Sequence, residues 1–324
     1  MARNSPPPPE YAPGLMLDLR EQPEGGKLPT RGELRGRQQG LPRPECVVLV
    51  HGFNNHYGEA SERYYGFRIM QRRHFDGEHG DIADGIEARA AGQARPVGGF
   101  SAELERLLGD TFWPGDADWP GPLDWLDALV YPAAVHTAQQ TAVLLADLIE
   151  RIPGLLRVHF VAHSLGCRVA LETLDILWAR GHPAIGAVCL MAAAVERDAV
   201  APGGRFSNLL AALGEAGSEI LVLHSRRDKV LRFTFPLGQT GAGEGFLPEA
   251  LGLEGPPPGM PGRVSGRRVA GANHGDYWGQ QDNEPSRFAT REAGAFLKLG
   301  ERVREIRARE PEAARTVGEA RAID

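Results

Sequence analysis

A serine, an aspartate and a histidine in this 324-residue chain each follow an apolar segment, and together they could perform acyl transfer. Ser164 lies between His163 and Leu165, directly after the apolar run 158–162. A tight turn from a strand into a helix lifts its side chain clear of the sheet and leaves space around it. We therefore predict that Ser164 is a nucleophile. The alternative is a buried serine that caps the amides of the next helix.

Acyl transfer also needs donors for the negative charge that develops on the substrate carbonyl oxygen. The apolar run 46–50 ends in a His51-Gly52 turn, which Phe53 follows. We predict that the backbone amides of Phe53 and Leu165 form this oxyanion hole. Gly52 lets the backbone approach closely because it has no Cβ. The alternative is that Gly52 only ends a strand.

The acid and the base follow two further apolar runs. Asp228 comes after the run 220–224, and His274 comes after a run that begins near Val269. His274 would accept the proton of Ser164, while Asp228 would set the imidazole tautomer and stabilise the imidazolium. The alternatives are a carboxylate that caps a loop or pairs with neighbouring cations, and a surface histidine.

Three other residues could take a catalytic role instead. Asp276, which follows His274 closely, could replace Asp228 as the acid, although capping the next helix would also explain it. His51 and His163 could act as the base, but both are expected to pack beside the reacting groups. The chain order Ser, Asp, His is the order of α/β-hydrolases rather than of chymotrypsin-like or subtilisin-like enzymes.

Several short motifs strengthen this interpretation. They are HGFNN at 51–55, AHSLG at 162–166, RDKVL at 227–231 and NHGDYW at 273–278. Over about residues 45–300, the chain resembles a bacterial α/β-hydrolase family of the lipase and esterase type. The run FWPG at 112–115 resembles the family's F-x-W-P stretch, although its Phe and Trp are adjacent here. The resemblance implies an α/β-hydrolase fold, with loop insertions that form a cap.

Apolar strands that alternate with helices predict a mostly parallel, doubly wound sheet with helices on both faces. The expected strands are 15–19 at an edge, 46–50, 111–113, 158–162, 185–194, 220–224 and one that ends before His274. The expected helices are 57–75, 101–109, 138–152, 166–180 ended by Gly181, and a last helix with Ala295, Leu299, Val303 and Ile306.

The predicted organisation is one hydrolase domain between two extensions. The predicted parts are a Pro/Gly-rich, partly irregular arm at 1–44, the domain at 45–308, a tail at 309–324, and cap insertions near 54–100, 114–132 and 232–262. The last insertion, with its many Gly and Pro residues, is expected to be irregular and to move as a flap. Residues expected to contact substrate are Gly52, Asn54, His163, Phe233 and Phe235. Plain packing is the alternative for the aromatic residues.

Composition limits the partners. The net charge of −6 argues against nucleic acid and anionic membranes, and the 42% hydrophobic content predicts a large core. We see no apolar segment long enough for integral membrane association, and the N-terminus lacks the apolar region of a signal peptide. An odd number of cysteines, three, fits a reducing compartment, so a cytoplasmic location is expected. No zinc-like spacing is present, and we predict no metal and no cofactor.

The sequence therefore predicts a cytoplasmic serine hydrolase that acts on a carboxylic ester, either a small molecule or lipid-like. An amidase, a thioesterase or an acyltransferase could use the same triad. A binding protein that retains the fold without turnover is the alternative from another class, and the intact Ser, Asp and His argue against it. No oligomeric state is predicted.

Overall fold

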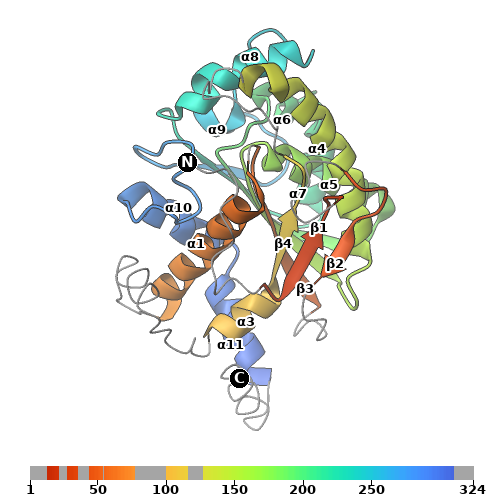
Figure 1. The fold of residues 1–324 in the computed structure, drawn as a ribbon, viewed down its shortest axis with the longest axis vertical. Helices are drawn as coiled ribbons and strands as arrows, with labels where there is room; N and C mark the ends of the chain where they lie inside the picture. The colour runs from red at the N-terminus through yellow and green to blue at the C-terminus, as the bar shows by residue number, and fades with distance from the viewer. Residues whose placement is uncertain are drawn as a thin grey trace.

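The computed structural model describes residues 13–21, 28–35, 44–53, 55–76, 100–115 and 127–309. Its centre is an eight-stranded sheet with the order β2-β1-β4-β3-β5-β6-β7-β8 (Figure 1). The strands are β1 Leu15–Asp18, β2 Glu33–Arg35, β3 Glu45–Val50, β4 Leu108–Phe112, β5 Arg157–His163, β6 Ala184–Met191, β7 Ile220–His224 and β8 Val264–Arg268. The pair β1 and β2 is antiparallel and the other pairs are parallel, which confirms the predicted mostly parallel sheet.

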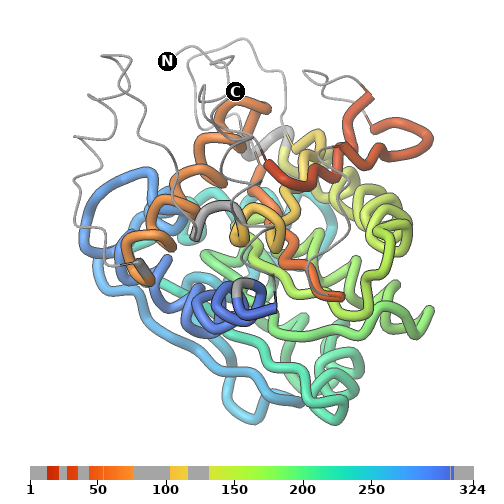
Figure 2. Tube along the Cα trace, turned by 90° about the horizontal axis from the view of Figure 1, so that it is seen from below, coloured from red at the N-terminus to blue at the C-terminus, as the bar shows by residue number. Residues whose placement is uncertain are grey.

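Helices cover both faces of this sheet. They are α1 Tyr57–Asp76, α3 Phe100–Leu107, α4 Asp127–Glu150, α5 Gly166–Arg180, α6 Arg197–Val200, α7 Ser207–Glu215, α8 Phe235–Gly241, α9 Leu251–Glu254, α10 Glu284–Phe296 and α11 Leu299–Arg309, with a π-helical turn η2 at Val230–Thr234. The helices α1, α3, α10 and α11 pack together on one face, while α4 packs with α5 and α8 (Figures 1 and 2). None of the described helices is long and apolar enough to cross a bilayer.

The core lies around the central strands. Residues Cys46–Val50 of β3 and Val158 to Ala162 of β5 are buried, because each strand has a neighbour on both sides and helices on both faces. By contrast, β8 at the sheet edge is mostly exposed. The strand predicted to end just before His274 lies earlier in the chain than expected. β8 ends at Arg268, and a loop leads from there to His274.

Several predicted elements are confirmed and others are shifted. The helix predicted at 57–75 forms as α1, and the helix at 166–180 forms as α5, ended by Gly181 with φ 77°. The helix predicted at 101–109 ends at Leu107, because the next residues pair in β4 instead. The strand predicted at 185–194 ends at Met191.

The prediction of a single last helix is wrong. The chain breaks at Lys298, where φ is 52°, and this break separates α10 from α11. Leu299, Val303 and Ile306 are buried on α11, whereas Ala295 lies exposed near the end of α10. One apolar spacing pattern therefore continued across two helices.

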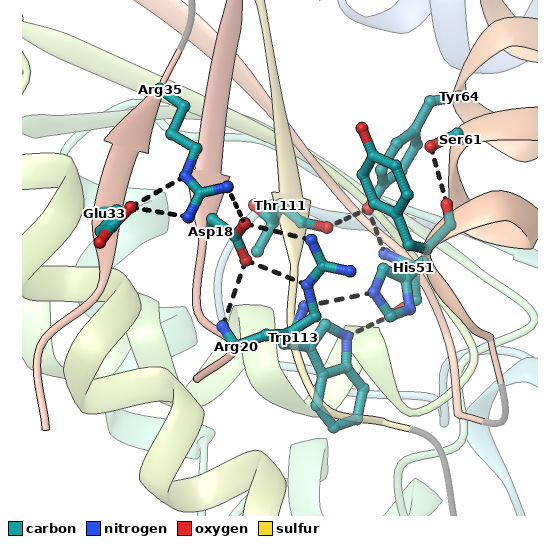
Figure 3. Close-up of polar contacts among 10 residues, drawn as sticks. Asp18, Arg20, Glu33, Arg35, His51, Ser61, Tyr64, Thr111 and Trp113 are labelled. Carbon is teal, nitrogen blue, oxygen red and sulfur yellow. Dashed lines mark hydrogen bonds and ion pairs between the residues drawn. The ribbon is translucent and has the colours of Figure 1, made fainter. Parts of the chain in front are cut away.

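The N-terminal segment contributes more to the sheet than an irregular arm would. The strand predicted at 15–19 forms as β1, but it is not at the edge, because β2 pairs outside it. Asp18 forms ion pairs with Arg20 at 3.0 Å and with Arg35 at 3.4 Å, so side chains also link the two strands (Figure 3). β2 has only three residues, two of them charged, and it lacks the apolar pattern that predicts a strand.

The cap segments are partly described. Asn54, residues 77–99 of the first predicted insertion and residues 116–126 of the second lie outside the described residues. The segment 232–262 was expected to be irregular, but it carries part of η2 together with α8 and α9. Buried side chains at helical spacing, such as Leu231 and Phe235, anchor these short helices.

Candidate active site

Ser164 lies on the turn between β5 and α5, with a φ of 54°. This left-handed conformation costs a non-glycine residue about 1–3 kcal/mol, so the surrounding structure must hold it. The Ser164 amide donates to the carbonyl of Met191 at 3.0 Å, and the Ser164 carbonyl accepts from Ala194 at 3.1 Å. Residues at and beyond the end of β6 thus hold the turn on both sides and keep the hydroxyl pointing out of the sheet.

Two glycines allow this turn to meet the turn after β3. A Cβ on Gly166 would lie 2.2 Å from the carbonyl oxygen of His51, and a Cβ on Gly52 would lie 2.7 Å from the Cβ of Ser164. Neither position has room for a side chain. The first turn of α5 therefore packs directly against the end of β3, and the predicted oxyanion turn lies beside the predicted nucleophile.

A hydrogen-bonded relay joins the predicted triad. Nε2 of His274 is 2.8 Å from Oγ of Ser164, and Nδ1 of His274 is 2.7 Å from Oδ2 of Asp228. A carboxylate only accepts hydrogen bonds, so the imidazole proton lies on Nδ1 and the Nε2 lone pair faces the serine hydroxyl. Asp228 is completely buried, and its other oxygen accepts from the amide of Leu231 at 3.0 Å.

Asp276 has a different position. Its Oδ2 accepts from the amide of Asn273 at 2.7 Å, and its Oδ1 accepts from Nδ2 of Asn283 at 2.9 Å. Both carboxylate oxygens therefore stabilise the loop that carries His274. This geometry corrects the alternative in which Asp276 replaces Asp228 as the partner of the imidazole.

Two further side-chain hydrogen bonds hold the loop that carries His274. Nε2 of His163 donates to the carbonyl of His274 at 2.7 Å, and Oγ of Ser225 donates to the carbonyl of Ala272 at 2.8 Å. The following aromatic residues anchor the loop, since Trp278 packs edge-on against Tyr64 with centroids 5.4 Å apart. No sequence pattern distinguishes Ser225, because a serine that follows a strand carries no local sign of its partner.

The pKa values of His163 and His51, which lie near the site, are both lowered. Burial lowers the pKa of His163 well below its usual range, and the nearby His274 and Arg63 lower it further. Burial also lowers the pKa of His51 to about 3. His163 uses its Nε2 proton to hold a backbone carbonyl and is 2% exposed, so we replace its predicted substrate contact with a supporting role.

His51 is held between two aromatic residues (Figure 3). Its backbone amide donates to the Tyr64 hydroxyl at 2.8 Å, and that hydroxyl donates to the carbonyl of Thr111 at 2.6 Å. The ring stacks on Trp113 with centroids 5.6 Å apart, and Nε2 accepts from the Trp113 amide at 3.3 Å. Nδ1 therefore carries the proton and donates to the carbonyl of Gly52 at 2.8 Å.

The amides of Phe53 and Leu165 belong to the two turns that meet at Ser164. Among the described residues, no hydrogen bond uses either amide as its donor. The Phe53 ring packs edge-on against Tyr131, with centroids 5.9 Å apart, and Leu165 is buried. The role of these amides as oxyanion donors stays a prediction.

The two predicted cap aromatics differ. Phe233 is 63% exposed, whereas Phe235 is 1% exposed and packs against Tyr131 with centroids 6.3 Å apart. We therefore no longer assign Phe235 a substrate contact, because it fixes α8 on α4. Phe233 is exposed at the surface of the cap.

Across the described residues, no group of His, Cys, Asp and Glu side chains could hold a metal ion. The three cysteines, Cys46, Cys167 and Cys189, are free and buried.

A mostly parallel eight-stranded sheet with a Ser-His-Asp relay at the carboxyl ends of its strands defines an α/β hydrolase. The chain belongs to the family described as alpha/beta hydrolase of unknown function (DUF900), whose model matches residues 32–240. The matched segment includes Ser164 and Asp228 and ends before His274. This membership agrees with the resemblance drawn from the motifs.

Solved esterase structures are also similar to this chain. EstE1, a thermophilic carboxylesterase cloned from a metagenomic library, is 14% identical, with a TM-score of 0.37 over 81% of this chain and 83% of its own. Carboxyl esterase 2 from the mycorrhizal fungus Tuber melanosporum is 12% identical, with a TM-score of 0.41 over 94% of each chain. An esterase from Pyrobaculum calidifontis is 16% identical, with a TM-score of 0.36 over 81% of this chain and 78% of its own. No curated protein matches the chain.

Proposed function

We propose that this protein is a serine hydrolase that cleaves carboxylic esters through an acyl-enzyme. The relay from Ser164 through His274 to Asp228 carries the proposal, since both of its hydrogen bonds are already in place. A protein that only binds ligands needs no such relay, and it needs no nucleophile in a left-handed conformation.

In this proposal, Oγ of Ser164 attacks the ester carbonyl carbon while Nε2 of His274 takes its proton. The carbonyl oxygen becomes an oxyanion that accepts hydrogen bonds from the amides of Phe53 and Leu165. Collapse of this intermediate breaks the bond to the alcohol, which leaves with the proton from His274. Water then repeats the sequence on the acyl-enzyme and releases the acid, while Asp228 stabilises the imidazolium in both halves.

The substrate class we favour is a small or lipid-like ester. Phe233 and Leu237 support this choice, because both are exposed apolar side chains on the segment that follows Asp228. Amides, thioesters and acyl transfer to another alcohol would use the same acyl-enzyme. A cytoplasmic location stays a prediction.

A fluorophosphonate probe tests the proposal directly. We expect one covalent adduct, which peptide mass spectrometry would locate on Ser164, and hydrolysis of p-nitrophenyl esters with a clear preference among acyl chain lengths. A parallel panel of anilides and thioesters of the same acids separates esterase from amidase and thioesterase activity. An unlabelled, folded protein that hydrolyses none of these substrates would contradict the proposal.

A further inference from the structure

The carbonyl oxygen of Gly52 accepts hydrogen bonds from two side chains. Nδ1 of His51 donates at 2.8 Å, and Nδ2 of Asn55 donates at 2.9 Å. Nδ2 of Asn55 also lies 3.0 Å from the carbonyl oxygen of Phe53. A carbonyl oxygen has two lone pairs, so these donors use its full capacity. The two contacts fix the plane of the Gly52-Phe53 peptide, which lies beside Ser164.

The amide of Phe53 belongs to that same peptide. In a trans peptide, the C=O and the N–H point in opposite directions, so holding the Gly52 carbonyl also holds the Phe53 amide. We propose that Asn55 is a positioning residue that fixes the Phe53 amide toward the oxyanion of the reaction. This inference rests on the proposed function, since it assigns a task to a residue that touches neither the nucleophile nor the base.

Arg63 on α1 fixes the orientation of the Asn55 side chain. Its Nε donates to Oδ1 of Asn55. A guanidinium has only donors and the two backbone carbonyls have only acceptors, so a single orientation of the amide satisfies all three partners. Asn55 is also 5% exposed, which leaves little room for another rotamer. α1 thus contributes to the site through the contact of Arg63 with Asn55.

The loss of this clamp has a defined structural consequence. A peptide plane held on one side only by His51 could rotate, and its carbonyl would then turn toward the position of the oxyanion. A carbonyl in that position would repel the developing negative charge instead of stabilising it. The reaction would slow at the chemical step, whereas binding of the uncharged ester would change little.

Asn55→Asp tests the inference with an isosteric change. The carboxylate can still accept from Arg63, but it places an acceptor against two carbonyl oxygens. We expect kcat to fall by about 100- to 1000-fold, the cost of losing one oxyanion donor, with KM changed by less than about threefold. Affinity for a trifluoromethyl ketone, whose adduct with Ser164 carries the same oxyanion, should fall by a similar factor.

Two further variants should be measured together with Asn55→Asp. Asn208→Asp makes the same chemical change at an exposed position on α7 and should leave kcat unchanged. Arg63→Met removes the guanidinium that orients the Asn55 side chain but keeps the side-chain amide of Asn55. We expect kcat to fall by about tenfold, because the transition state is then stabilised less. If Asn55→Asp fails to fold, Arg63→Met carries the same kinetic comparison.

A crystal structure of Asn55→Asp gives a result that does not depend on turnover. We expect the Gly52 carbonyl to have rotated toward Ser164. An unrotated peptide, or a kcat within about threefold of the wild-type value, would overturn the inference. If the wild-type protein itself fails to react with the fluorophosphonate, the proposed function is overturned, and the orientation of the peptide in the variant still decides the structural part of the inference.

Discussion

The two halves of the candidate site are positioned in different ways. Its interior half consists of the turns after β3 and β5, where Gly52 and Ser164 follow closely on buried strands. Its edge half consists of the loops after β7 and β8, which carry Asp228 and His274 away from the strand ends. In the interior half the backbone of the sheet itself sets the position of the reacting group.

The edge half depends on side-chain contacts instead. β8 has a neighbour on one side only and is mostly exposed, so the sheet constrains its loop weakly. Hydrogen bonds from His163 and Ser225 to backbone carbonyls hold that loop in place. Removing a side-chain hydrogen bond that holds the His274 loop should therefore misplace the base, whereas removing one inside α5 should leave the nucleophile in place.

The largest expected effect is the loss of the nucleophile in the interior half. Ser164→Ala should abolish fluorophosphonate labelling and lower ester turnover by about four to six orders of magnitude. The melting temperature should stay unchanged or rise, because the sheet and not the hydroxyl positions this turn. Ser265→Ala on β8 is the matched control. Residual activity above about a hundredth of the wild-type value would contradict the assignment.

The acid gives the next largest effect and separates two carboxylates in the edge half. Asp228→Asn should lower kcat by about three to four orders of magnitude, because the imidazole then takes the wrong tautomer. Asp276→Asn should lower kcat far less and should instead lower the melting temperature, since Asp276 supports a backbone amide. Steady-state kinetics and thermal unfolding of both variants provide the comparison. A reversed order of the two kcat losses would mean that Asp276 is the acid.

A moderate effect tests the difference between the halves directly. Ser225→Ala removes the bond to Ala272, so we expect a cost of about 1 kcal/mol in unfolding free energy and a kcat loss of about three- to tenfold from a misplaced base. Thr173→Val removes a buried hydroxyl from α5, where it donates to Val169 at 2.7 Å. It should cost similar stability and leave kcat unchanged. Equal kinetic losses in both variants would remove the distinction.

The smallest effect is on stability in acid. His51 and His163 have folded-state pKa values below that of an unfolded histidine, near 6.5. Below that pH the unfolded chain takes up protons that the folded protein does not, so stability falls as the pH falls. For His51 this loss continues until the folded pKa of about 3 is reached, and full stability is present above the unfolded value.

Urea unfolding of the wild type and of His51→Gln at pH values from about 4 to 8 measures this contribution. We expect the variant to lose about 1.4 kcal/mol less per pH unit between pH 6 and 4, which corresponds to one proton. Above about pH 7 the two slopes should agree. Equal slopes throughout would show that the pKa of His51 is the same in the folded and unfolded protein.

Local patterns in the sequence were enough to locate the interior half. Apolar runs that end abruptly at small residues predicted β3, β5 and the turn at Ser164, because a strand covered on both faces has to be apolar throughout. The sequence also predicted helices α1 and α5, and α5 ends at Gly181 as expected. The order Ser, Asp, His also followed from the sequence alone.

Only the tertiary structure decided which groups are partners across the chain. The sequence favoured Asp228 as the acid but left Asp276 as an alternative, and packing brings Asp228 to Nδ1 of His274. Asn55, like Ser225, gains its role from contacts made after folding. The physical reason is that apolar patterning fixes which segments are buried, whereas a hydrogen bond depends on the position of two groups to within a fraction of an ångström. That position is set when distant segments pack together.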